Sequence, residues 1–107
     1  MSEVSNTSRI NISKKVLQVI SLIAASEKDG FVKGKVRIRE NNKLDLATKN
    51  PLSQRHFIID INAVFSYGTD LKSASEKIQK AVKNSIKTMT GLEIDRVNLY
   101  ISDIIYK

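Results

Sequence analysis

Three stretches of the chain alternate apolar and polar residues with the period of two that is typical of β-strands. They span residues 32–39, 57–67 and 94–104, and a shorter stretch at 9–12 shows the same pattern. In the second stretch the apolar face is formed by Phe57, Ile59, Ile61, Ala63, Phe65 and Tyr67. In the third we expect the inward residues to be Val97, Leu99 and Ile101. The pattern therefore predicts four strands.

Two other stretches repeat apolar residues at the spacing of an α-helix. The first follows Ser13, a good N-cap residue, and ends at Asp29-Gly30. Its inward positions are predicted to be Val16, Leu17, Ile20, Ile23 and Ala24. Val19 and Leu22 widen this apolar arc, so the polar strip is narrow and consists of Lys14, Gln18, Ser21 and Ala25. A helix with so wide an arc must be covered on more than one side.

The second helix is predicted between Asp70, as its N-cap, and Gly91, which ends it. One face is apolar and comprises Leu71, Ala74, Ile78, Ala81, Val82, Ser85 and Met89. The opposite face is mostly basic and carries Lys72, Glu76, Lys80, Lys83 and Lys87. This division is typical of a helix that packs on a sheet and exposes its charged side to water.

The order of elements is strand, helix, strand, strand, helix, strand, which indicates an α+β fold. We expect a two-layer sandwich with a mainly antiparallel sheet and both helices on one face. Residues 1–8 are predicted to be a disordered terminus, and residues 9–107 a single domain. A polar, Asn- and Lys-rich connection at about 40–55 is predicted to be a mobile loop.

Composition limits the possible function classes. The chain has 107 residues, no Cys, and a formal net charge of +7, enough to favour contact with nucleic acid, anionic lipid or acidic proteins. The first residues show no secretory signal, and the most apolar stretch, 16–25, is about half the length of a membrane span. We therefore expect a cytoplasmic protein.

Candidate catalytic chemistry is sparse. His56 is the single histidine, so no His-based metal set can form, and the serines lack a GxSxG nucleophile motif. Asp60 lies in an apolar strand, where burial could raise its pKa, but strand parity places it beside Asn62 on a half-polar face. A surface histidine and a solvated or paired carboxylate are the favoured interpretations. We expect no enzymatic activity, cofactor or metal.

A row of basic residues on one strand raises the alternative of nucleic-acid binding. Lys33, Lys35, Arg37 and Arg39 share one side of the stretch 32–39, and the element order resembles that of an RNA-recognition sheet. Such sheets stack bases on outward aromatic rings, whereas here only Tyr100 is predicted to point outward. A second basic face lies on the helix at 72–87, which disperses the charge. Specific nucleic-acid binding is therefore not favoured.

Several motifs resemble one bacterial family, the alkaline shock or general stress proteins of the envelope stress response. Ile10-Asn11-Ile12 precedes a helix that runs from Val16 through Ile23-Ala24-Ala25-Ser26-Glu27 to Gly30. Asp60 in an apolar strand, the Tyr67-Gly68 turn and the final block "TMTGLEIDRVNLYI" also resemble the family. The likeness covers most of residues 9–104, and it departs most clearly at "FVKGKVRIR" and at the loop 40–55.

The resemblance implies a small non-enzymatic protein that acts at or near the membrane through self-association and protein partners. One such partner would be a small membrane-anchored protein, and some relatives are linked to enzymes of lipid synthesis. The first hypothesis is therefore a scaffold or adaptor, and the alternative is a basic surface for nucleic acid or anionic lipid. The candidate interaction surface comprises Val19, Leu22, Lys33, Lys35, Arg37, Arg39 and Tyr100. The basic alternative would use the strand 33–39 and the lysines from Lys72 to Lys87.

Overall fold

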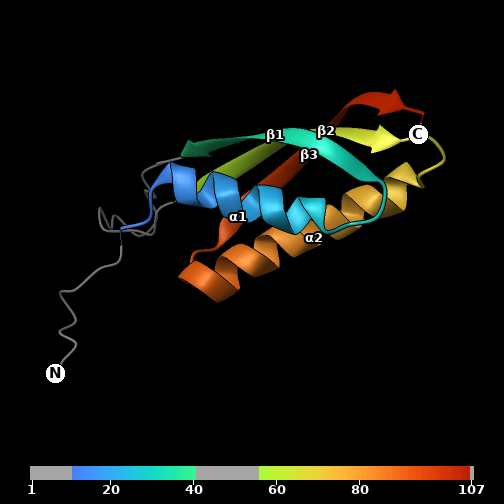
Figure 1. Cartoon of the computed structure of the whole chain (residues 1–107). Coiled ribbons are helices and arrows are strands. Elements are labelled where there is room, and N and C mark those ends of the chain that lie inside the picture. The colour runs from blue at the N-terminus through green and yellow to red at the C-terminus, as the bar shows by residue number, and fades with distance from the viewer. Residues whose placement is uncertain (1–10, 41–55, 107) are drawn as a thin grey trace, which may run out of the picture.

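The computed structural model describes residues 11–40 and 56–106 and confirms the α+β fold (Figure 1). Within these residues the order is α1 (Lys14–Ser26), β1 (Phe31–Glu40), β2 (Phe57–Ser66), α2 (Leu71–Thr90) and β3 (Ile94–Ile105). The strand order in the sheet is β1-β2-β3. β1 pairs with β2 in antiparallel fashion and β2 pairs with β3 in parallel, so the sheet is mixed.

The strand predicted at 9–12 lies only partly among the described residues. Asn11 and Ile12 are not in a strand, and Ile12 is half-buried against the core instead. The terminus predicted at 1–8 lies outside the described residues. So does the predicted loop, apart from Glu40, which is the last residue of β1.

The helix ends follow the capping chemistry of the sequence. The Ser13 hydroxyl accepts a hydrogen bond from the Val16 backbone N–H at 3.2 Å, and the Asp70 carboxylate accepts one from the Ser73 backbone N–H at 3.2 Å. Each bond satisfies a backbone donor that the first turn of a helix leaves unpaired. Gly91 ends α2 in the left-handed region, with φ at 80°. These local signals are why both predicted helix starts are confirmed.

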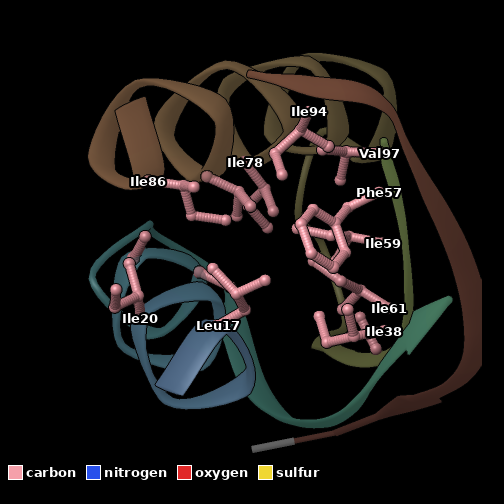
Figure 2. Close-up of a cluster of buried hydrophobic side chains, with 14 of the residues drawn as sticks. Leu17, Ile20, Ile38, Phe57, Ile59, Ile61, Ile78, Ile86, Ile94 and Val97 are labelled. Atoms are coloured by element: carbon pink, nitrogen blue, oxygen red, sulfur yellow. The ribbon is translucent and has the colours of Figure 1, made fainter. Parts of the chain in front are cut away.

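The hydrophobic core lies between the two helices and one face of the sheet (Figure 2). β2 runs through its centre and contributes Phe57, Ile59, Ile61, Ala63 and Phe65, all fully buried. The helices add Leu17 and Ile20 from α1 and Ile78, Val82 and Ile86 from α2. Both helices therefore cover the same face, as predicted, and no helix among residues 11–40 and 56–106 covers the other face, called the open face below.

The orientation of α1 differs from the prediction. Ser21 and Ala25, predicted to be polar-strip residues, are fully buried, whereas Val16 and Ile23, predicted to be inward, are exposed. Small side chains allow α1 to lie close to β1 and α2. The buried Ser21 hydroxyl meets its need for a hydrogen bond by donating to the Leu17 carbonyl at 2.7 Å. The helix is therefore rotated away from the apolar arc expected from hydropathy alone.

Smaller corrections apply to α2 and to the ends of the strands. Ile86 is buried, whereas Met89, predicted to be inward, is 69% exposed. Tyr67 lies beyond the end of β2 and is exposed, and Ile101 on β3 is 40% exposed. These residues lie at the margins of the core, where the covering layer ends and a regular apolar pattern no longer implies burial.

Each outer strand of the sheet receives a hydrogen bond from a glutamine on a helix. The Gln18 amide of α1 donates to the Val36 carbonyl of β1 at 3.1 Å, and the Gln79 amide of α2 donates to the Val97 carbonyl of β3 at 3.0 Å. Each bond covers part of a sheet edge that would otherwise present backbone groups to another chain.

Candidate interaction surface

An exposed apolar stripe runs along α1. It comprises Val16, Val19, Leu22 and Ile23, which are between 39% and 54% exposed. Their spacing places them on the side of the helix that faces away from the core. A contiguous set of large apolar side chains in water is typical of a contact surface. The structure thus exposes both α1 residues of the predicted interaction surface and adds Val16 and Ile23, which we had predicted to be inward.

A shallow groove separates this stripe from β1. Its volume is about 360 Å³, and its apolar lining comes from Val19, Leu22 and Val36. Gly34 forms part of the floor, and Lys15 and Lys35 stand at the rim. The groove therefore combines an apolar floor with positive charge.

The open face of the sheet carries the predicted basic row. Lys33, Lys35, Arg37 and Arg39 are all exposed, and strand pairing aligns Lys35 with Asn62 of β2 and Asn62 with Tyr100 of β3. Tyr100 is therefore on the same face, two strands away from the row. The seven predicted residues fall into two groups, on opposite sides of β1.

Asp60 lies in the middle of the open face and is only 8% exposed. Its carboxylate accepts two hydrogen bonds from Arg39, at 2.6 and 3.1 Å, and one from the Asn98 amide at 3.0 Å. The bonds from Arg39 are the main reason that the pKa of Asp60 lies below its usual value, with a smaller contribution from Asn98 and against the effect of burial. Burial acts to raise this pKa, but the hydrogen bonds outweigh it, and the favoured interpretation of a paired carboxylate is confirmed.

The pairing with Asp60 also reduces the charge that Arg39 can offer to a binding partner. Because its guanidinium is held by Asp60, Arg39 does not present a free charge in the way that the other members of the row do. Lys33, Lys35 and Arg37 form no ion pair with another described residue, although Arg37, opposite Asp60 in the strand register, helps to lower the pKa of that carboxyl. The positive charge available to a partner is thus concentrated in the three residues at 33, 35 and 37.

His56 is half-buried at the start of β2, and its Nδ1 lies 3.0 Å from the Asp95 carboxylate at the start of β3. No third ligand accompanies this pair, and the residues 11–40 and 56–106 contain no cluster of His, Cys, Asp or Glu that could hold a metal ion. The pair ties the ends of two neighbouring strands together. This is a structural contact, in keeping with a surface histidine.

The basic face predicted on α2 is exposed, with Lys72, Lys80 and Lys83 pointing to solvent. Lys87 forms an ion pair with Glu93 at 3.3 Å. Beside this face lies a hollow of about 540 Å³ lined by charges of both signs, among them Lys80, Lys83 and Asp95. Mixed charge gives the hollow no clear preference for an anion or a cation.

Comparison with protein families decides the affiliation. Residues 2–106 match the alkaline shock protein 23 family, described as having a cell envelope-related function. The chain belongs to this family. The resemblance seen in the sequence motifs is confirmed, and it extends across the segments where those motifs were weak.

Two relatives of this alkaline shock family member come from Bacillus subtilis (strain 168). The uncharacterized protein YqhY is 27% identical over 115 residues, which cover 95% of this chain and 81% of YqhY. The uncharacterized protein YloU is 24% identical over 107 residues, which cover 90% of this chain and 88% of YloU. Among the described residues, neither helix has the length and apolar character required to cross a membrane.

Proposed function

We propose that this alkaline shock family member is a non-enzymatic adaptor of the envelope stress response that binds a protein partner through α1. The observation that carries the proposal is the exposed stripe of Val16, Val19, Leu22 and Ile23 on an otherwise well-packed helix. The family's cell envelope-related function supports the setting. The adaptor would act in the cytoplasm, at or near the membrane.

The pairing of the Asp60 carboxylate supports an adaptor over an enzyme. Asp60 is held by Arg39 and Asn98, and His56 is held by Asp95. A general base must reach a substrate with a free lone pair; the bonds from Arg39 and Asn98 occupy the Asp60 carboxylate, whereas the contact of His56 with Asp95 uses only Nδ1. The favoured partner is a small membrane-anchored protein, with an enzyme of lipid synthesis or a second copy of the chain as further candidates.

The test is affinity capture of the tagged full-length protein from native cells, with the double variant Val19→Ser and Leu22→Ser. We expect the variant to lose the captured partner, because removing two exposed apolar side chains reduces the buried area at the contact. The stability of the protein should fall by only about 1 kcal/mol, because both side chains are partly exposed and make few core contacts. Thermal unfolding checks this.

The matched control is Met89→Ser, which removes an exposed apolar side chain at the far end of α2. This control should retain the partner. Retention of the partner by the α1 variant, or equal loss in the control, would contradict the proposal.

A further inference from the structure

The outer edge of β1 has backbone groups directed away from the sheet. The Val36 carbonyl accepts a hydrogen bond from the Gln18 amide on α1, so it points outward from the sheet. Backbone direction alternates along an antiparallel strand, so Gly34 and Ile38 also direct their N–H and C=O groups to this edge. In the ranges 11–40 and 56–106 no strand lies beyond β1. Such an edge is a template for a further strand.

The two sides of this edge differ in chemistry. On the side of the helices lies the groove with its apolar floor of Val19, Leu22 and Val36. On the open side stand three exposed cations, Lys33, Lys35 and Arg37. Gly34 lies between the two sides, and it lines a second hollow of about 320 Å³ on the open face. A side chain at Gly34 has no room, since its Cβ would lie 2.7 Å from the Asn62 carbonyl oxygen.

We propose that β1 accepts a strand from a different protein in which apolar residues alternate with Asp or Glu. The side chains of a strand point alternately to the two faces of a sheet. Every second residue of the partner would therefore enter the apolar groove, and the residues between would lie beside Lys33, Lys35 and Arg37. The inference rests on the proposed adaptor function and names the chemistry of its partner.

Charge argues against two of the occupants that this chain itself could supply, a second copy and residues 1–10. A second copy paired through its own β1 would bring two rows of four basic residues side by side on the open face, and like charges across a strand pair are destabilising. Residues 1–10 contain a single acidic residue, Glu3, and are mainly Ser, Asn and Thr at the remaining polar positions. Neither offers alternating carboxylates.

The side-chain amide of Gln18 occupies the position that a backbone N–H of the added strand would take. This amide donates to the Val36 carbonyl, the same acceptor that a backbone N–H of an added strand would use. The added strand must displace this amide. Replacement of Gln18 by Met keeps the length of the side chain but removes the competing donor, so the variant should bind the strand more tightly than the native chain.

The test uses the full-length protein and synthetic peptides of about nine residues, the length of a long strand. One peptide alternates Val and Glu, a second alternates Val and Lys, and a third has the composition of the first with its Val and Glu residues in blocks. Calorimetry gives affinities, and NMR maps the amides that shift. We expect only the first peptide to bind, with the largest shifts at Gly34, Val36 and Ile38.

Variants identify the two determinants. The double variant Lys35→Glu and Arg37→Glu should weaken binding of the Val/Glu peptide by about tenfold and gain binding of the Val/Lys peptide. Lys80→Glu, on the outer face of α2, should leave both affinities unchanged. Gln18→Met should tighten binding of the Val/Glu peptide about three- to tenfold, the effect of one hydrogen bond no longer in competition.

Four results would overturn the inference. They are equal binding of the block peptide, shifts confined to α2, slow exchange of the Gly34 and Ile38 amides in the free protein, and binding of anionic vesicles without binding of the Val/Glu peptide. The first two exclude strand pairing, the third shows an edge already covered, and the fourth assigns the basic row to lipid. If cellular capture still depends on Val19 and Leu22 in such a case, the adaptor function stands and only the strand partner is wrong.

Discussion

Asp60 shows how a single residue can appear catalytic in the sequence and prove structural in the fold. A carboxylate inside an apolar strand is costly unless its oxygens are hydrogen-bonded. Here Arg39 reaches across from β1 and Asn98 from β3, so all three strands meet at one carboxylate. The group therefore acts as a polar cross-link in the open face, which none of the described helices covers.

Asp60→Asn should lower stability at neutral pH by about 1 kcal/mol, at the low end for a charged hydrogen bond because Arg39 is half exposed. The folded-state pKa of Asp60 lies below its usual value of 3.8, so its contribution is complete above that value. The contribution is lost as the pH falls through the lower, folded pKa. The difference in melting temperature between the native protein and the variant should therefore persist to about pH 4 and close below it.

The control for this measurement is Glu76→Gln, which removes an exposed carboxylate on α2. This variant should have the same melting temperature as the native protein both at neutral pH and below about pH 4. A gap between the native protein and Asp60→Asn that is independent of pH would show that the Asn amide disturbs the strands by its shape and would contradict the ionic role.

At the residue scale, strand parity predicted the exposure of the basic row and of Tyr100 but not the pairing of Arg39. Arg37 is directly opposite Asp60 in the strand register, and yet the diagonal neighbour Arg39 makes the bonds. The register between β1 and β2 depends on a connection at 41–55 whose length does not fix it. The sequence could therefore show which residues share a face, but not which of them meet.

At the scale of elements, α1 departs from its hydropathy. Its most buried residues include Ser21, Ala24 and Ala25, while four larger apolar side chains are exposed. Burial of small residues allows close approach of α1 to its neighbours, and this gain in packing decides the rotation of the helix. A hydropathy pattern ranks residues by their free energy of transfer from water. It contains no information on the space between the helix and the elements that it packs against. This is why the exposed stripe was predicted only in part.

Ser21→Leu should destabilise the protein by about 1 to 3 kcal/mol, because a larger side chain has no space at a fully buried position. Ser21→Ala should cost far less, since the hydroxyl only returns a bond to the Leu17 carbonyl of its own helix. Denaturant unfolding of both variants measures the difference. The control is Leu22→Ser at the next position, on the exposed side of α1, which should destabilise the protein less than Ser21→Leu. Tolerance of Leu at 21 would mean that α1 can rotate and that the apolar stripe is not a fixed surface.

At the scale of the whole molecule, the fold places its positive charge on two sides. The two helices lie on one side of the sheet (Figure 1). The basic row lies on the open face of the sheet, whereas Lys72, Lys80 and Lys83 are exposed on α2, in the helical layer. Sequence order was enough to predict this separation, because it follows from the α+β layers. The mixed sheet was not predicted, since the direction of β3 depends on the route of the chain through α2.

Charge on two opposite sides cannot form one groove for a nucleic acid, so any binding to duplex DNA should be weak and independent of sequence. We compare two triple variants at about 50 mM salt. The first carries Lys33→Glu, Lys35→Glu and Arg37→Glu on β1, and the second carries Lys72→Glu, Lys80→Glu and Lys83→Glu on α2. Both should weaken DNA binding by similar factors, because each removes three phosphate contacts. Binding of the native protein should be lost by about 200 mM salt. Fluorescence anisotropy with two unrelated duplexes measures both effects. Loss in the first variant alone, with a preference for one duplex, would assign the open face to nucleic acid and remove the reason for an acidic protein partner there.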